Sequence, residues 1–417
     1  MSTVETGEKR GNQPAVLRAV ILFVIASLFP GCSTLEAIRI VNGGTAFSTT
    51  AEPTDVPFSL HGHLILIKAS VNDDPREMVF MVDTGALTVI NKTIADTMAF
   101  TQDVALTGKD SSGHTKETRL VEIESLKIGN KEVKKCAASI FDLGLIERAM
   151  GIRVDGIIGS NVLRFFNVTI DYKHKNISLS QNKQSPEEGR HRIRFKQDMT
   201  VGFAPVVEAK IEDKYTVPAI IDTGYDGYFA AIPSPLLKKL QRPGRGRLVK
   251  GAGMGGAFGI ASEGELQRLK SFAVGTDLRV ANVPVEATKM DKALLGKQFL
   301  DKFVVTINYL TNELTLSPYE ENPRFRSNIF SIGLRVMYDE ENRAKGIGIE
   351  QDSPAEKQGL KLGDEVVQVN GKPVRSYTVP ELRELLVLDE EIRQVKLVVR
   401  REDNERTILL DKAYVFE

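Results

Sequence analysis

The chain contains the stretch Met78-Val79-Phe80-Met81-Val82-Asp83-Thr84-Gly85-Ala86, in which five apolar residues run directly into Asp-Thr-Gly. The apolar run predicts a buried strand, and Gly85 allows the chain to turn sharply where that strand ends. A carboxylate at the end of a buried strand is costly unless it is paired, hydrogen-bonded or protonated. Asp83 therefore needs a partner from elsewhere in the chain.

A matching stretch lies 139 residues further on (222 − 83), where Pro218-Ala219-Ile220-Ile221-Asp222-Thr223-Gly224 again leads an apolar strand into Asp-Thr-Gly. Two later strands, Ile157-Ile158-Gly159 and Leu294-Leu295-Gly296, are separated by 137 residues (296 − 159). The aspartates and the closing glycines therefore repeat at nearly the same spacing, which indicates an internal duplication. We therefore predict that the two aspartates face each other and share a proton.

Each copy has the same order of predicted elements. An opening hairpin leads to the Asp-Thr-Gly turn, a short helix follows, and a Gly-bearing polar segment lies between strands before a closing pair of strands. We place the two copies at residues 55–180 and 193–318. The alternative interpretation of a single Asp-Thr-Gly is a surface turn, and two copies in matched context argue against it.

The repeated pattern resembles the retropepsin-like and pepsin-like aspartic proteases. In each copy, Asp-Thr-Gly is followed by two branched apolar residues with Gly, and then by a strand that ends in Tyr. The resemblance covers about residues 57–318 and implies a mainly β, bilobed protease built from two tandem β-barrel lobes. It also implies that the Gly-bearing segments 108–114 and 251–258 are flaps over the substrate.

The resemblance implies one catalytic dyad with local support and no cofactor or metal. The two aspartates would activate a water molecule, the threonines would brace the two turns, and the glycines would let backbone N–H groups approach the carboxylates. The residues concerned are Asp83, Asp222, Thr84, Gly85, Thr223 and Gly224.

Two residues depart from the family pattern. Pepsin-like enzymes usually carry Ser or Thr after Asp-Thr-Gly, whereas this chain has Ala86 and Tyr225. Without that hydroxyl the ionised dyad lacks one hydrogen bond, which raises the pKa of the pair. We therefore expect a weakly acidic optimum of activity.

A different pattern follows a polar linker at residues 318–328. The string Ser-Pro-Ala, Gly-Leu, Gly-Asp and Val-Asn-Gly over residues 353–371 closely resembles a bacterial PDZ domain, an α+β module that we place at 329–413. PDZ domains add a peptide to their sheet as an extra strand and hold its carboxylate on loop N–H groups. The resemblance assigns that loop to Ser331, Ile332, Gly333 and Leu334; the alternative is a plain strand start.

Residues 1–32 are predicted to be an export segment. The apolar run from Ala19 to Phe29 has eleven residues, fewer than the ~20 that a membrane-spanning helix needs, and is typical of a secretory signal. Gly31-Cys32 after it resembles the lipobox of bacterial lipoproteins, although Phe29 and Pro30 are unusual there. The resemblance implies that Cys32 is lipidated and anchors the protein in the bacterial cell envelope, facing the periplasm. Ordinary secretion and a retained N-terminal anchor are the alternatives.

Composition excludes other classes of partner and site. Lys plus Arg and Asp plus Glu both number 55, so no net field attracts nucleic acid. Cys136 has no partner for a disulfide, and we interpret it as a small buried apolar residue rather than a nucleophile. His61 and His63 point to one face of a strand, but no third ligand is evident, so we expect no metal site.

Two functions remain for the chain. The first is an aspartic endopeptidase whose PDZ domain recruits or orients polypeptide substrates by their C-terminal or exposed segments. The second is a catalytically inactive peptide-binding protein of the envelope, with the cleft and the PDZ domain acting as an adaptor. Two intact Asp-Thr-Gly turns favour the first function, and Tyr225 favours the second.

Overall fold

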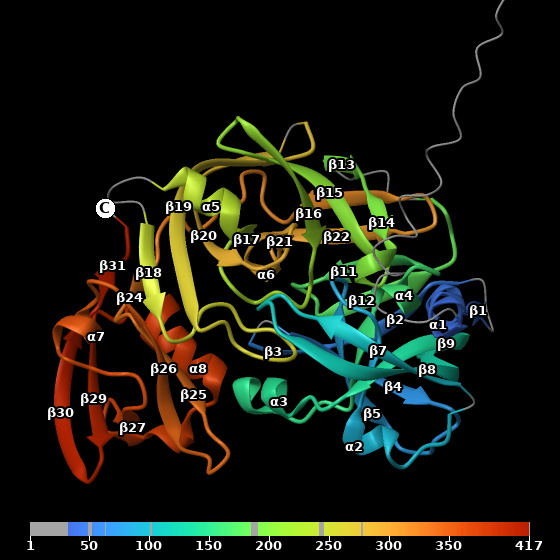
Figure 1. Ribbon diagram of the computed structural model, residues 1–417. Helices are drawn as coiled ribbons and strands as arrows, with labels where there is room; N and C mark the ends of the chain where they lie inside the picture. Colours follow the sequence, from blue (N-terminus) through green and yellow to red (C-terminus); the bar gives the residue numbers. More distant parts are fainter. Residues whose placement is uncertain are drawn as a thin grey trace, which may run out of the picture.

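The computed structural model describes residues 32–48, 52–62, 64–100, 102–184, 191–241, 246–276 and 278–416. The predicted export signal at residues 1–31 lies outside them. The architecture is mainly β, as the sequence predicts, with two lobes side by side and a third unit at the C-terminal end (Figure 1). In the described part of the chain, no helix is both long enough and apolar enough to span a membrane.

The first lobe is a sheet that closes on itself. Its strands β4, β5, β10, β6, β9 and β8 follow one another in pairing order, and β8 pairs with β4 to complete a ring. The elements are α1 (Cys32–Asn42), β1 (Thr45–Ser48), β2 (Thr54–Pro57), β3 (Ser59–His61), β4 (Leu64–Val71), β5 (Met78–Asp83), β6 (Val89–Asn91), α2 (Lys92–Ala95), β7 (Asp103–Lys109), β8 (Thr115–Ile128), β9 (Lys131–Phe141), α3 (Gly144–Met150), β10 (Gly156–Gly159), α4 (Ser160–Leu163), β11 (Asn167–Asp171) and β12 (Asn176–Ser180).

The second lobe repeats this ring strand for strand, with β15, β16, β21, β17, β20 and β19 in the same order and β19 closing on β15. The elements are β13 (His191–Arg194), β14 (Lys196–Asp198), a 3₁₀ turn (Met199–Val201), β15 (Ala204–Ile211), β16 (Tyr215–Ile221), β17 (Ala230–Pro233), α5 (Ser234–Leu240), β18 (Gly246–Lys250), β19 (Glu263–Val274), β20 (Leu278–Thr288), β21 (Ala293–Leu295), α6 (Lys297–Leu300), β22 (Phe303–Asn308) and β23 (Glu313–Pro318). The duplication inferred from the sequence is therefore present in the strand topology.

A sheet shared by both lobes joins them, in the order β13-β23-β22-β11-β12-β2. At its centre β11 runs antiparallel to β22, with Thr169 opposite Thr306 and their hydroxyl oxygens 3.0 Å apart. These threonines hold the same place in the two closing sequences, Phe166–Tyr172 and Phe303–Tyr309. The local twofold relation between the lobes therefore passes between them.

The main strands of the C-terminal unit extend the sheet of the second lobe, and its hydrophobic cluster also takes in Tyr228, Val249 and Leu266 of that lobe. Its elements are β24 (Phe330–Ser331), β25 (Leu334–Tyr338), β26 (Ala344–Glu350), α7 (Pro354–Lys357), β27 (Glu365–Val369), β28 (Lys372–Pro373), a 3₁₀ turn (Val374–Ser376), α8 (Val379–Arg383), a π turn (Glu384–Leu388), β29 (Gln394–Arg401), β30 (Asn404–Asp411) and β31 (Ala413–Tyr414). The sequence pattern of the PDZ domain predicts a helix over 380–388, and the structure has a short α-helix there that continues into a π turn.

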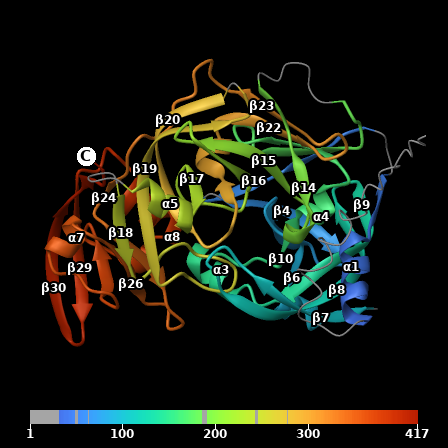
Figure 2. The same ribbon diagram turned by 45° about the horizontal axis from the view of Figure 1, so that its top comes forward.

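The C-terminal unit docks against both lobes (Figure 1, Figure 2). Strand β18 of the second lobe pairs antiparallel with β26, with Val249 opposite Glu350, so that the two sheets are continuous. Helix α3 of the first lobe lies against β25 and α8. The unit is therefore packed into the molecule rather than tethered to it by a linker.

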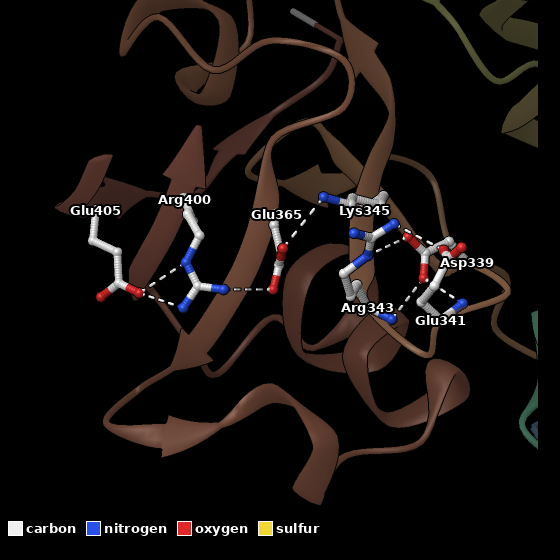
Figure 3. A network of polar contacts seen from close by, with 7 residues as sticks. All are labelled: Asp339, Glu341, Arg343, Lys345, Glu365, Arg400 and Glu405. Atoms are coloured by element: carbon white, nitrogen blue, oxygen red, sulfur yellow. Dashed lines mark hydrogen bonds and ion pairs between the residues drawn. The ribbon is translucent and has the colours of Figure 1, made fainter. Parts of the chain in front are cut away.

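The outer face of this unit carries a network of ion pairs (Figure 3). Arg400 bonds to Glu365 at 3.1 Å and to Glu405 at 2.5 Å, and Lys345 also reaches Glu365. Their side chains are partly exposed to solvent. Exposed pairs of this kind contribute about 1 kcal/mol or less each, so the network is a useful place for control substitutions.

We expect Gly159→Ala to destabilise the first lobe by about 2 kcal/mol or more, because overpacking a tight site costs this much. A Cβ at Gly159 would lie 2.3 Å from the carbonyl oxygen of Ala86 and 2.5 Å from the carbonyl carbon of Leu87, and both are backbone atoms. Urea unfolding measures the loss. Gly246→Ala is the control, since its Cβ would meet nothing closer than 3.7 Å; equal stability of the two variants would contradict the packing described.

Candidate functional site

The two Asp-Thr-Gly turns meet between the lobes. A Cβ added to Gly85 would lie 2.6 Å from Cγ of Asp222, and one added to Gly224 would lie 2.4 Å from Cγ of Asp83. Real Cβ atoms do not approach this closely, so each turn requires glycine where the opposite carboxyl group packs against it. The two carboxyl groups therefore lie close together at the boundary between the lobes.

Reciprocal hydrogen bonds between two threonines hold the turns together. The Thr84 N–H donates to Oγ1 of Thr223 at 3.0 Å, and the Thr223 N–H donates to Oγ1 of Thr84 at 3.1 Å. Each hydroxyl then donates to a carbonyl of the other lobe: Thr84 to Ile221 at 2.6 Å and Thr223 to Val82 at 2.9 Å. Both threonines are buried, so every one of these polar groups needs its partner.

The closing strands support the turns from behind. In the first lobe β10 runs parallel to β5 with Gly159 opposite Asp83, and in the second lobe the Asp222 N–H donates to the Leu295 carbonyl at 2.9 Å. Sequence reasoning missed one further support: Ser160 Oγ donates to the Thr84 carbonyl at 2.7 Å and lies 2.6 Å from the Tyr309 hydroxyl. The place of Ser160, directly after the closing glycine, was the available signal.

Burial raises the pKa of both aspartates, and the nearby charge of Asp83 raises the pKa of Asp222 further. Backbone donors act in the opposite direction, because they stabilise the ionised form. The Gly85 N–H lies 2.8 Å from Oδ1 of Asp83, and the N–H groups of Gly224 and Tyr225 lie 2.9 and 3.0 Å from Oδ1 of Asp222. Two carboxyl groups this close titrate as a pair, so neither member has a pKa of its own.

The Tyr225 side chain points away from the two carboxyl groups. Its hydroxyl donates to Oε1 of Glu286 at 2.8 Å and accepts the Tyr228 N–H at 3.0 Å. Burial and the negative charge of Glu286 raise the pKa of the Tyr225 phenol. Tyr225 departs from the family pattern, but its side chain bonds elsewhere, while its backbone still contacts Asp222.

The two Gly-bearing segments predicted to be flaps touch each other. The Phe258 N–H donates to Oδ2 of Asp110 at 2.7 Å, and Ser111 Oγ donates to the Gly255 carbonyl at 3.2 Å. The Phe258 ring meets Phe141 edge to face, with 5.1 Å between ring centroids. The tips of the two segments therefore form a bridge between the lobes.

The loop expected to hold a peptide carboxylate is buried. Gly333 has φ +80° and its Cβ would lie 2.1 Å from that of Ser353, so the backbone there requires glycine. The Ile332 N–H donates to the Leu386 carbonyl at 3.1 Å, and the Gly333 N–H donates to Ser331 Oγ at 2.7 Å. Leu334 is the first residue of β25. A bound carboxylate would have to replace the hydrogen bonds of this loop, and the peptide-binding role of Ser331–Leu334 stays a prediction.

The remaining sequence candidates carry no chemistry in the described structure. Cys136 is buried, and burial raises the pKa of its thiol to about 12, which suits a packing residue. His61 Nε2 lies 2.7 Å from the Met150 carbonyl, whereas His63 lies outside the described residues. Among the residues described, no three His, Cys, Asp or Glu side chains gather as metal ligands. The Cys32 side chain is also outside the description.

Comparisons with known proteins agree with this architecture. A family model described as Aspartyl protease matches residues 67–162, and one described as PDZ domain matches residues 348–401. An uncharacterized protein of Archaeoglobus fulgidus is 30% identical over 119 residues, which is 27% of this chain and 86% of that protein. The protease match contains Asp83 and Gly159 and falls entirely in the first lobe.

We expect Asp222→Asn to stabilise the fold increasingly as the pH rises. The folded pKa of Asp222 is raised above its ordinary 3.8, so the folded state keeps a proton that the unfolded chain releases. The stability that this group provides is complete below about pH 4 and falls by up to about 1.4 kcal/mol per pH unit until the folded pKa is reached. Urea unfolding from pH 4 to pH 8 measures the difference between variant and parent.

Asp403→Asn is the control for this measurement, because Asp403 is exposed on the turn between β29 and β30. The free energy of unfolding of the Asp403→Asn variant should equal that of the parent at every pH. A constant gap between Asp222→Asn and the parent across the range would mean that Asp222 does not keep a proton in the folded state.

Proposed function

Because this chain belongs to the aspartyl protease family and carries a PDZ domain, we propose that it is an aspartic endopeptidase in which Asp83 and Asp222 act as one dyad. The observation that carries the proposal is the meeting of the two Asp-Thr-Gly turns at the ends of equivalent strands, where each carboxyl group packs against the glycine of the opposite turn. Two buried acids sharing one proton supply a base and an acid in a single site.

The proposed reaction uses one bound water molecule. The ionised carboxyl group takes a proton from the water as its oxygen attacks the scissile carbonyl carbon, while the protonated carboxyl group transfers its proton to the carbonyl oxygen. The resulting tetrahedral gem-diol collapses as its C–N bond breaks: the amine nitrogen receives the proton taken from the water, and one hydroxyl returns its proton to the other carboxylate. Two products leave, and the dyad again holds one proton.

Substrate entry requires the flap bridge to open. The contacts between Asp110 and Phe258 and between Ser111 and Gly255 hold the two segments together, and in this proposal the bridge covers the dyad. A polypeptide would displace these contacts and be held beneath the two segments, which would exclude water from the reacting bond. In this proposal, opening and closing of both segments accompany each turnover.

The PDZ domain would recruit or orient the polypeptide. A peptide added beside β25 would be placed next to α3, since that helix of the first lobe lies against β25 and α8. Recruitment would thus occur at the boundary between the PDZ domain and the first lobe, which shortens the path from the recruiting groove to the dyad.

The inactive, peptide-binding alternative rested on Tyr225. Its hydroxyl donates to Glu286 and its N–H donates to Asp222, so the residue adds a backbone hydrogen bond to the dyad while its hydroxyl is engaged elsewhere. The endopeptidase proposal is therefore the better supported, and the experiment below separates the two.

The test is a digest of labelled casein or a peptide library by the parent protein, Asp83→Asn and Asp222→Asn. We expect each variant to lose activity about a hundredfold or more, because general acid–base groups contribute this much. Asp403→Asn is the matched control and should retain activity. Equal cleavage by the parent and both dyad variants would eliminate this proposal, and absence of cleavage by the folded parent on any substrate would favour the peptide-binding adaptor.

The pH–rate profile of the parent provides a second readout in the same assay. Burial raises the pKa of both carboxyl groups, and Ala86 offers no side-chain hydroxyl to counter this. We therefore expect a weakly acidic maximum, falling at low pH when both carboxyls are protonated and at high pH when both ionise. A maximum below about pH 3 would contradict this account.

We also propose that Cys32 is lipidated and that the protein is anchored in the bacterial cell envelope, facing the periplasm. Support comes from α1, which packs on the first lobe with Ile40 buried, so that an acyl group on Cys32 would hold this lobe near the membrane. A clickable palmitate analogue should label the parent and Cys136→Ser, and should not label Cys32→Ser. Equal labelling, or none, of the parent and Cys32→Ser would reject the anchor.

A further inference from the structure

The loop after Asp222 is longer than its counterpart after Asp83. In the first lobe Val89 pairs with Ile157, six residues after Asp83 (89 − 83). In the second lobe the equivalent pair joins Ala231 to Leu294, nine residues after Asp222 (231 − 222). Three additional residues therefore lie between the dyad residue and its supporting strand in the second lobe only.

The shorter loop is held by its own lobe. The Thr88 N–H donates to Oδ1 of Asn161 at 2.8 Å, and the Gly159 N–H donates to Oγ1 of Thr88 at 3.0 Å. In the longer loop, Gly227 has no side chain to make such a bond. Its carbonyl accepts one bond from its own lobe, from Gln298 Nε2 at 2.8 Å.

The PDZ domain supplies further contacts to the longer loop, beside those from its own lobe. Arg383, the last residue of α8, donates through Nη1 to the Asp226 carbonyl at 2.6 Å and to Oδ2 of Asp226 at 3.0 Å. Its Nη2 donates to the Gly227 carbonyl at 3.1 Å. One planar guanidinium thus fixes two successive peptide units, a geometry that an ammonium group reproduces only in part.

A second arginine of the PDZ domain acts on the same loop through Glu286. The carboxylate of Glu286 is buried and accepts the Tyr225 hydroxyl, and Arg335 of β25 lies 3.8 Å from its other oxygen. A buried carboxylate needs a nearby cation. Tyr228 of the loop also packs within the hydrophobic cluster of the PDZ domain. The loop is therefore held at several points by a domain outside the two lobes.

The loop in turn contacts the dyad, because the Tyr225 N–H donates to Oδ1 of Asp222 at 3.0 Å. We propose that Arg383 and Arg335 are positioning residues for this loop, so that the PDZ domain completes the half of the active site that carries Asp222. The inference rests on the proposed endopeptidase function. It assigns the domain a role in turnover besides the recruitment of substrate.

The test measures kcat and KM of the full chain on one peptide substrate for the parent, Arg383→Met and Arg383→Lys. Loss of a contact that orients a catalytic loop lowers kcat, and we expect Arg383→Met to lose roughly tenfold or more. KM should change less than twofold, since Arg383 touches the loop and not the substrate. Arg383→Lys should recover part of kcat because its ammonium group can still reach a carbonyl.

Arg400→Met is the matched control, since it removes an arginine from the exposed ion-pair network of the same domain (Figure 3). It should keep parental kcat and KM. Titration with a statine-containing peptide inhibitor counts the competent sites in each sample, so that kcat refers to folded protein only.

The possible outcomes are distinct. A lower kcat per titrated site in Arg383→Met, with partial recovery in Arg383→Lys, supports the positioning role. Parental kcat per site in Arg383→Met overturns it, whether or not fewer sites are present, and so does a loss confined to KM, which would indicate recruitment alone. If the parent cleaves and Asp83→Asn does not, the endopeptidase function survives either of these results; a parent without activity removes both proposals.

Discussion

The structure depends on the four hydrogen bonds exchanged by Thr84 and Thr223 across the boundary between the lobes. Each threonine satisfies backbone groups of the opposite lobe, and both are buried, so separating the turns would leave donors and acceptors without partners. The same bonds force two carboxyl groups into one small space. In the proposed dyad, a shared proton reduces the energetic cost of that proximity and supplies the property that acid–base chemistry requires.

The duplication was kept where symmetry serves the shared site and altered elsewhere. Both barrels keep the same strand order, and Thr169 and Thr306 still face each other in the shared sheet. The loop after Asp222 is longer than its counterpart after Asp83, and the strand β18 pairs with β26 of the PDZ domain. The lobe with the longer loop is thus the lobe that a continuous sheet joins to the PDZ domain.

Much of this architecture could be predicted from the sequence because local chemistry repeats at fixed spacing. The paired Asp-Thr-Gly turns, their closing glycines and the PDZ pattern identified the fold. The short helix expected after each Asp-Thr-Gly turn is α2 at Lys92–Ala95 in the first lobe and α5 at Ser234–Leu240 in the second.

The contacts that could not be predicted join residues that are distant in the chain and that belong to no repeated motif. Arg383 lies 157 residues after Asp226, and nothing in its local sequence separates it from other surface arginines. The bond between Ser160 and Tyr309 spans 149 residues and crosses the lobes. Such pairings depend on how the barrels and the PDZ domain pack, which periodicity and turn chemistry do not determine.

A double-mutant cycle on Thr84→Val and Thr223→Val tests the central claim most directly. The free energy of unfolding would be measured by urea denaturation for the parent, both single variants and the double variant at one pH. If the turns interlock as described, the two substitutions are strongly non-additive, with a coupling energy of about 1 kcal/mol or more. Additive effects would contradict the account, because they would mean that the two turns do not touch in solution.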